Sequence, residues 1–358
     1  ASATSARSPV LSAADEIRAA IAAAGGAISF ERFMHLALYG EQGFYTSGGS
    51  AGRRGDFITS PEVGPLFGAV LARMVDALWH QLGEPEQFTV IEAGAGPGTL
   101  ARAFRAAQPD CLGVVSYVAV EVSAQQRAAH PDWITSVASM PTEPIVGVVI
   151  ANELLDNLAF RLFVMDGGWR EAFVIVRPDG TFAEVLRSAD DLDQLSLPQS
   201  AAHGSRVPVQ SEAANWLAQT RALVSQGVVL VIDYASATTA GLAMRPWRQW
   251  LRTYRGHERG GHYLAEPGSQ DITAEVALDH LLASSGHAAN VRTQRQFLQR
   301  WGIDDLVAEG QRIWNEQAAR PTVAALTMRS RVREAEALCD PQGLGAFIVV
   351  EIAAAATA

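Results

Sequence analysis

The sequence predicts an α/β fold of the doubly wound type, with a mostly parallel sheet and helices on both of its faces. The first observation is a set of short runs rich in Val and Ile, separated by helix-like segments: residues 88–94, 113–122, 145–153 and 227–235. Strands that are buried on both faces have this composition, and their alternation with helices is typical of parallel sheets. The second observation is the glycine-rich turn from Gly94 to Gly98, directly after the first run, where such folds bind ligands.

The first 87 residues are expected to form a helical extension and a wall on the substrate side. Residues 15–26 end in a glycine pair, and residues 28–40 have apolar side chains at helical spacing before a final glycine. Both patterns indicate helices, since glycine commonly stops a helix. A loop rich in Gly, Ser and Arg follows over residues 45–56, and residues 65–81 return to helical periodicity.

Residues 88–358 are expected to form the core, with two insertions, at about 160–210 and 235–270, that form a cap. Residues 161–176 alternate around Asp166-Gly167-Gly168, which predicts a β-hairpin. The second insertion is irregular and rich in Trp and Gly, and residues 343–353 predict a final strand.

The composition excludes several classes of function. The net charge is −10, so the chain lacks the dense basic surface of a nucleic-acid or membrane binder, and no run of about 18 apolar residues predicts a transmembrane span. Cys111 and Cys339 cannot form a disulfide framework or a cysteine zinc site, and a reducing cytoplasm is the expected location. His257 and His262 lack a third nearby ligand, so no metal site is expected.

The glycine-rich turn lies in VIEAGAGPGTLARAF, residues 90–104, which predicts a strand, a turn and a helix. Its three glycines allow a tight turn and the close approach of a ligand to the backbone. A dinucleotide fingerprint would need glycine where Thr99 stands, which disfavours a nicotinamide dehydrogenase. The pattern acid-x-G-x-G-x-G instead resembles the first motif of class I S-adenosylmethionine (SAM) methyltransferases. The structural alternative is a βα turn without a ligand.

Glu121 ends the second predicted strand, 23 residues after Gly98. A carboxylate at this point can accept hydrogen bonds from both ribose hydroxyls of an adenosine ligand. The alternative is that Glu121 only caps the next helix.

Further segments extend the resemblance. They are YGEQGFYTSGGSAGRRGDFITSPEVGPLFG, ANELLDNLAFRLF, VIDYA, LAEPGSQDITAEVALDHL and RTQRQFLQRWGI. In this order and with this spacing, they resemble the MidA-like SAM-dependent methyltransferases, a family that includes a mitochondrial protein arginine methyltransferase. The resemblance runs from about Phe30 to Ile303, and it implies the class I SAM methyltransferase fold, which is Rossmann-like, with SAM as the cofactor.

The resemblance and the glycine turn together suggest which residues meet the cofactor. The expected cofactor-binding residues are Thr59, Ser60, Pro61, Glu92, Gly94, Gly96, Gly98, Thr99, Leu100, Glu121, Val122 and Asn152. Glu62, Glu153 and Asp156 are the candidate catalytic residues, because the paired N–H donors of a guanidinium match carboxylate oxygens. The alternative is that these three acids only complement helix ends or cap them.

The first expected function is SAM-dependent transfer of a methyl group to a protein arginine side chain. The alternatives are methylation of a small molecule or peptide natural product, and a SAM-binding assembly factor with little catalysis. The chain departs from the family pattern at Leu154, Leu155, Asn157 and Ala159, and residues 154, 155 and 157–159 are expected to line or approach the acceptor pocket, so the acceptor stays open. The expected partner is a methyl-acceptor protein or small molecule, and a homodimer is left open.

Overall fold

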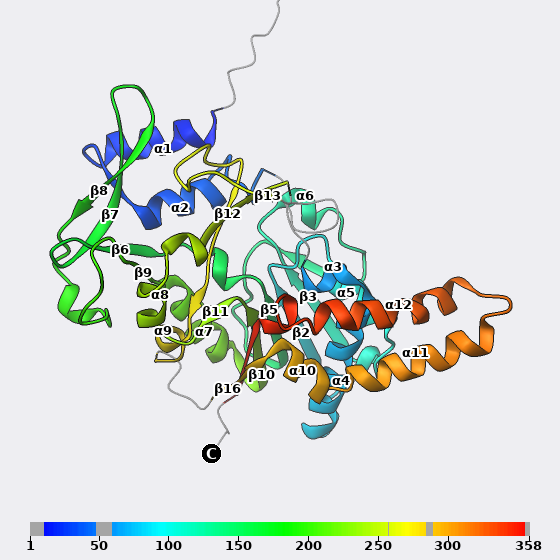
Figure 1. Ribbon diagram of the computed structural model, residues 1–358. Helices are drawn as coiled ribbons and strands as arrows, with labels where there is room; N and C mark the ends of the chain where they lie inside the picture. The colour runs from blue at the N-terminus through cyan, green and yellow to red at the C-terminus, as the bar shows by residue number, and fades with distance from the viewer. Residues whose placement is uncertain (1–10, 48–58, 257, 284–288, 355–358) are drawn as a thin grey trace, which may run out of the picture.

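The fold is built around a seven-stranded sheet (Figure 1), in a computed structural model that describes residues 11–47, 59–256, 258–283 and 289–354. Its strands are β2 (Phe88–Ala93), β3 (Val115–Val120), β4 (Thr135–Val137), β5 (Ile145–Asn152), β10 (Val224–Asp233), β16 (Ala289–Thr293) and β17 (Ile348–Ala353), in the order β16-β17-β10-β5-β2-β3-β4. The five strands from β4 to β10 are parallel, whereas β17 is antiparallel to both of its neighbours. The predicted α/β class with a mostly parallel sheet is therefore confirmed.

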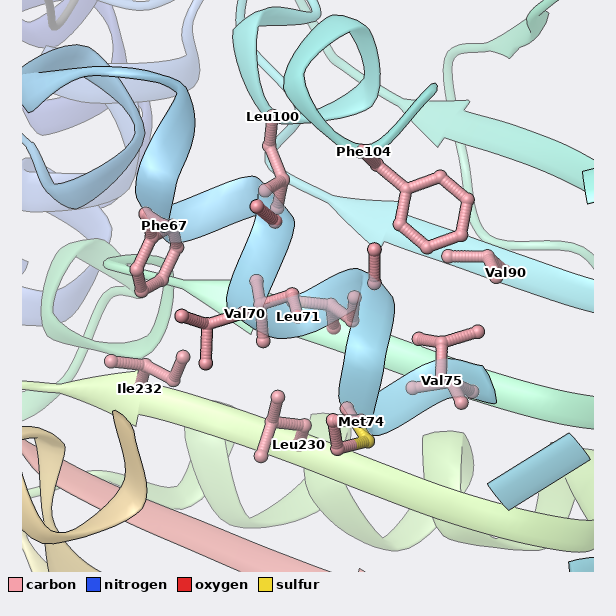
Figure 2. Close-up of a cluster of buried hydrophobic side chains, with 14 of the residues drawn as sticks. Phe67, Val70, Leu71, Met74, Val75, Val90, Leu100, Phe104, Leu230 and Ile232 are labelled. Atoms are coloured by element: carbon pink, nitrogen blue, oxygen red, sulfur yellow. The ribbon is translucent and has the colours of Figure 1, made fainter. Parts of the chain in front are cut away.

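Helices cover both faces of this sheet. On one face, α4 (Pro65–Gln81) and α5 (Thr99–Ala106) pack against the strands, and Figure 2 shows the α4 side chains of Phe67, Val70 and Met74 close to those of Leu230 and Ile232 on β10. The α4 residues recur at a spacing of three and four, which aligns them on one side of the helix. On the other face, α7 (Ser211–Leu223) and α9 (Leu278–Ala283) supply buried leucines to the core.

A second sheet forms most of the predicted cap. Its order is β1-β7-β6-β9, with β8 paired to β7, and its strands are β1 (Ile28–Ser29), β6 (Arg161–Met165), β7 (Trp169–Val176), β8 (Phe182–Arg187) and β9 (Arg206–Val209). β6 and β7 form the predicted hairpin, in which Met165 pairs with Trp169. The helices α1 (Ala13–Ala23) and α2 (Phe30–Tyr39) share a hydrophobic core with this sheet. Since β1 pairs with β7, the N-terminal extension is not purely helical and joins the first insertion.

The second insertion adds two small sheets. They consist of β11 (Ala235–Ser236) with β15 (Val276–Ala277), and of β13 (Glu258–Arg259), β12 (Leu251–Arg255) and β14 (Asp271–Ala274). The remaining α-helices are α3 (Ser60–Val63), α6 (Ala124–Arg127), α8 (Thr239–Ala243), α10 (Gln294–Arg300), α11 (Ile303–Gln317) and α12 (Val323–Leu338). In Figure 1, α11 and α12 lie side by side and extend away from the body as a helical hairpin. Within the described ranges, no helix has the length and apolarity needed to cross a membrane.

Candidate active site

A cavity of about 410 Å³ opens at the carboxyl ends of β2, β3 and β5. This volume lies in the range of small-molecule sites, and the carboxyl edge of an open α/β sheet is where such ligands bind. The loops after the three strands line one part of the cavity. Other parts are lined by residues of α2 and α7, by the segment 59–62, by Tyr45 and by residues 138–140 after β4.

The glycine turn after β2 has a backbone that only glycine adopts easily. Gly94, Gly96 and Gly98 have φ values of 73°, 52° and 79°, all in the left-handed region. The amide N atoms of Gly94 and Ala95 donate hydrogen bonds to the Val120 carbonyl oxygen, at 2.9 and 3.0 Å. A Cβ atom on Gly96 would lie 3.3 Å from a side-chain oxygen in the cavity wall. The predicted close approach of a ligand to this backbone is therefore compatible with the structure.

Glu121 connects the end of β3 to the glycine turn. Its Oε2 accepts a hydrogen bond from the Gly96 amide N at 2.9 Å, and its Oε1 accepts one from the Ser123 amide N at 2.8 Å. The N-cap of α6 is Ser123, whose hydroxyl accepts from the Gln126 amide N. Glu121 is therefore not the helix cap of the alternative interpretation, and it lines the cavity directly.

Glu92 lines the cavity at the end of β2 and is 5% exposed. The Tyr117 hydroxyl donates a hydrogen bond to Glu92 Oε2 at 2.7 Å. Burial raises the pKa of Glu92 to about 8, although the bond from Tyr117 acts in the opposite direction. The carboxyl is therefore largely protonated at neutral pH, because the cavity wall disfavours its charged form.

The segment after residue 58 brings a further carboxyl into the cavity. Thr59, Pro61 and Glu62 line it, and the Thr99 hydroxyl donates a hydrogen bond to Glu62 Oε1 at 2.7 Å. Ser60 is buried and does not line the cavity, since its hydroxyl donates to the Gln294 side chain at 3.0 Å. The first part of the GDFITSPE motif, residues 55–58, lies outside the described residues.

Glu153 follows β5 and lines the cavity with an unusual backbone. Its φ is 53°, a left-handed value that is uncommon for residues other than glycine and that often marks functional sites. The Glu153 amide N donates to the Ile232 carbonyl oxygen at 2.8 Å, so the turn is tied to β10.

Glu153 is half-buried, and its carboxyl lies among polar groups. Oε1 accepts from Asn152 Nδ2 at 3.2 Å and from the Ser60 amide N at 3.4 Å, and Oε2 accepts from the Tyr234 hydroxyl at 3.3 Å. Burial, followed by the nearby Asp156 carboxyl, raises the pKa of Glu153 to about 8. Asn152 also lines the cavity, and its Oδ1 is buried without a hydrogen-bond partner among the described residues.

Asp156 does not have the position that the sequence predicts. It lies in the short 3-10 helix Leu155–Asn157, is 3% exposed and is not among the residues that line the cavity. The Thr273 hydroxyl donates a hydrogen bond to its carboxyl, and burial raises its pKa to about 6. The expectation that Asp156 faces the transferred methyl group is therefore corrected: its side chain is used in packing the second insertion against this turn.

The other expected cofactor residues lie together. Apart from Ser60 and Gly98, every one of them lines the cavity: Thr59, Pro61, Glu92, Gly94, Gly96, Thr99, Leu100, Glu121, Val122 and Asn152. Gly98 instead precedes α5 as its N-cap residue. Within the described ranges, no group of three His, Cys, Asp or Glu residues could hold a metal ion, and His257 lies outside them.

One wall of the cavity is formed by residues that the sequence did not predict. His35 and Tyr39 of α2, Tyr45, and Glu212 and Trp216 of α7 all line it. The rings of Tyr39 and Tyr45 are stacked, with centroids 5.6 Å apart. Helical periodicity does not distinguish a side chain that faces a cavity from one that faces the core. The only signal in the sequence was the spacing of four between His35 and Tyr39 and between Glu212 and Trp216, which places each pair on one face of its helix.

Comparison with known proteins adds the decisive observation. Residues 70–296 match the family described as "Putative S-adenosyl-L-methionine-dependent methyltransferase". The chain belongs to this family. It is therefore a SAM-dependent methyltransferase, and the expected resemblance, enzyme class and cofactor are confirmed.

Individual relatives cover most of the chain. A crystal structure from Burkholderia thailandensis, bound to S-adenosylhomocysteine, is 28% identical, has a TM-score of 0.81 and covers 95% of this chain and 91% of its own. The class I SAM methyltransferase fold is thus confirmed. Protein arginine methyltransferase NDUFAF7, mitochondrial, of Danio rerio is 26% identical over 78% of this chain and 74% of its own length. The Homo sapiens protein of the same name is 26% identical over 74% of this chain and 67% of its own length.

The expected cytoplasmic location is corrected by these comparisons. The relatives from Danio rerio, Drosophila melanogaster and Homo sapiens are all named as mitochondrial proteins. The scarcity of cysteine indicated a reducing compartment but could not distinguish one such compartment from another.

Proposed function

We propose that this methyltransferase transfers the methyl group of SAM to an arginine side chain of a protein. The observation that carries the proposal is the pair of cavity carboxyls, Glu62 and Glu153, which come from different segments and border the same space. Carboxylates are the natural partners of a guanidinium, since its N–H donors match their oxygens. The names of the relatives, protein arginine methyltransferases, support the same acceptor.

In this proposal the cofactor occupies the part of the cavity bordered by the glycine turn and the end of β3. Gly94 and Gly96 allow close approach to the backbone, and the free lone pairs of Glu121 accept the ribose hydroxyls. The rest of this wall consists of Thr59, Pro61, Thr99, Leu100, Val122 and Asn152. Two further residues do not line the cavity but hold its wall in place: Ser60, which is bonded to Gln294, and Gly98, which precedes α5.

Methyl transfer requires the protein to orient the acceptor and to remove a proton from it. SAM supplies an activated methyl group, whose transfer to nitrogen leaves S-adenosylhomocysteine and one proton to be removed from the acceptor. Glu153 is suited to take that proton, because a base with a pKa near the working pH is the most effective. A bound guanidinium favours the ionised form of Glu153, so acceptor binding itself prepares the base. Glu62 orients the guanidinium, and Asp156 holds the turn that carries Glu153.

The acceptor class is tested with labelled SAM. The purified protein is incubated with deuterated-methyl SAM and a lysate of its own source cells from which its gene has been deleted. Mass spectrometry of proteins and small molecules then locates the label. The proposal predicts labelled methylarginine in protein, and label confined to a small molecule or to a non-arginine side chain would reject it in favour of the alternative acceptor.

A further inference from the structure

Two helices, α2 and α7, form the cavity wall that the sequence did not predict. His35 and Tyr39 lie four residues apart on α2, and Glu212 and Trp216 lie four residues apart on α7. Residues at this spacing share one face of a helix, and all four side chains line the cavity. Each helix therefore presents one polar or charged residue and one aromatic residue to the same space.

Two carboxyls near this wall, those of Glu31 and Glu212, have no direct ion pair with arginine in the described part of the chain. Glu31, one turn before His35 on α2, is half-buried, and burial and then the neighbouring Glu212 raise its pKa. Burial also raises the pKa of Glu212, while His35 acts in the opposite direction. Within residues 11–47, 59–256, 258–283 and 289–354, no arginine forms an ion pair with Glu31 or Glu212. The cationic groups that act on these two carboxyls are His35, near Glu212, and Arg161, which lowers the pKa of Glu31 but is itself paired with two other acids.

Glu212 also has a structural contact, since its carboxylate accepts a hydrogen bond from the backbone of Ala159. A first-turn acid complements the positive end of a helix dipole, and Glu212 is the second residue of α7. That interaction is available to an acid exposed to solvent, whereas Glu212 is half-buried in the cavity wall beside Trp216. Burial of a carboxyl costs free energy, and a ligand cation would offset that cost.

We propose that Glu212, supported by Glu31, is the specificity-determining residue that selects a positively charged acceptor side chain. The carboxylate pairs with the guanidinium, and the ring faces of Trp216 and Tyr39 stack on it through cation–π contact. This inference rests on the proposed arginine acceptor and adds the residue that distinguishes arginine from a neutral side chain of the same shape. In this arrangement Glu153 remains the base, and Glu212 binds the guanidinium of the acceptor.

The test uses two tripeptides of nearly the same shape, acetyl-Gly-Arg-Gly-amide and acetyl-Gly-citrulline-Gly-amide. In citrulline an oxygen replaces one guanidinium nitrogen, which removes the positive charge. Their dissociation constants are measured by NMR on the full chain saturated with S-adenosylhomocysteine. The wild-type protein is expected to prefer the arginine peptide by at least about tenfold, since a hydrogen bond to a charged group is worth roughly 1.5–3 kcal/mol. Glu212→Gln should reduce this preference to less than about threefold. The matched control is Glu86→Gln, at an exposed position between α4 and β2, and it should retain the wild-type preference.

Folding is checked separately, because Glu212→Gln must melt at the wild-type temperature and bind S-adenosylhomocysteine as the wild type does. An equal preference for arginine in wild type and Glu212→Gln would overturn the role of Glu212 while leaving arginine methylation intact. The role of Glu212 would also be overturned if the wild-type protein bound the arginine and citrulline peptides equally well. If the preference exists and depends on Glu212, but the labelling experiment finds no methylarginine, the cation-binding wall stands and the proposed function fails.

Discussion

Glu153 combines three properties that seldom occur together in one residue. It has a left-handed backbone, its side chain is half-buried in the cavity wall, and its pKa is raised to about 8. Each of these is unfavourable for a glutamate that serves only packing, since strain and burial both cost free energy. Their coincidence at the end of a central strand is the main residue-scale support for an acid–base role.

A second raised pKa gives a prediction for stability. The pKa of Glu92 rises from its ordinary 4.5 to about 8 on folding, so the protonated carboxyl stabilises the native state below pH 4.5 and this contribution is lost as pH rises towards 8. The contribution of this group to the free energy of unfolding should therefore decrease as the pH rises from 4.5 to 8, by up to roughly 1.4 kcal/mol per pH unit. Glu92→Gln, which is neutral at every pH, should have a flatter profile. Urea titrations of both proteins at pH 5 and pH 8 measure the difference, and parallel profiles would contradict the raised pKa.

Glu121 gives a prediction for cofactor affinity. Glu121→Ala removes the acceptor of the Gly96 and Ser123 amides and of the proposed ribose hydroxyls, so S-adenosylhomocysteine binding should weaken at least about tenfold. Glu121→Gln keeps one acceptor oxygen and should lose less. Calorimetric titration distinguishes the three proteins, and equal affinity in all of them would remove Glu121 from the cofactor site.

At the scale of elements, the turn after β5 depends on Asp233 at the end of β10. Asp233 Oδ2 accepts from the Leu155 and Asp156 amides at 2.9 and 3.2 Å, and Oδ1 accepts from the Tyr234 amide at 2.8 Å. Burial, together with the Asp156 and Glu153 carboxyls, raises the pKa of Asp233 well above its ordinary value. One buried carboxyl thus fixes the segment that carries Glu153 and Asp156.

This arrangement predicts different outcomes for two substitutions. Asp233→Ala leaves buried amides without an acceptor and should lower the free energy of unfolding by at least about 2 kcal/mol. Asp233→Asn keeps an acceptor oxygen for the Leu155 and Asp156 amides, so it should lose less than half as much. Denaturant titration measures both changes. A similar loss for the two variants would mean that the charge of Asp233, rather than its hydrogen bonds, stabilises the turn.

The elements that could be predicted from sequence are those whose pattern is local. The Val- and Ile-rich runs that are buried on both faces became β2, β3, β5 and β10, and the apolar stripe of α4 gave its bounds, Pro65–Gln81. β16 was missed because ANVRT is short and partly exposed, so its pairing with β17 depends on a distant segment. The two-residue strand β1 was missed for the same reason.

The same distinction between local patterns and long-range packing applies to the residues of the site. The glycine turn, Glu92 and Glu121 could be placed because each follows a recognisable strand. Asp156 was misplaced because the short 3-10 helix after β5 rotates successive side chains to different sides, and the sequence does not specify which side meets the cavity. Glu212 and His35 could not be identified, since their approach depends on how the cap packs on the sheet.

At the scale of the whole molecule, the cavity is shared by the sheet and the cap, so a ligand should stabilise both. At a concentration 100 times its dissociation constant, S-adenosylhomocysteine should stabilise the native state by about 2.7 kcal/mol and raise the melting temperature by a few degrees. Gly96→Val should abolish this shift, because φ of 52° is unfavourable for valine and its side chain would enter the cavity. Differential scanning calorimetry measures the shift. An undiminished shift in folded Gly96→Val would contradict the assignment of the glycine turn.

The central claim is that one cavity holds the cofactor at the glycine turn and the acceptor at Glu153. The most direct test measures S-adenosylhomocysteine affinity and methyl-transfer rate together in wild type and Glu153→Gln. Glutamine resembles the protonated carboxyl, so the fold should be preserved. We predict that the transfer rate falls by about 100-fold or more, as expected for loss of a general base, while the affinity for S-adenosylhomocysteine stays within about threefold. A parallel fall of both quantities, or no change in either, would contradict the account.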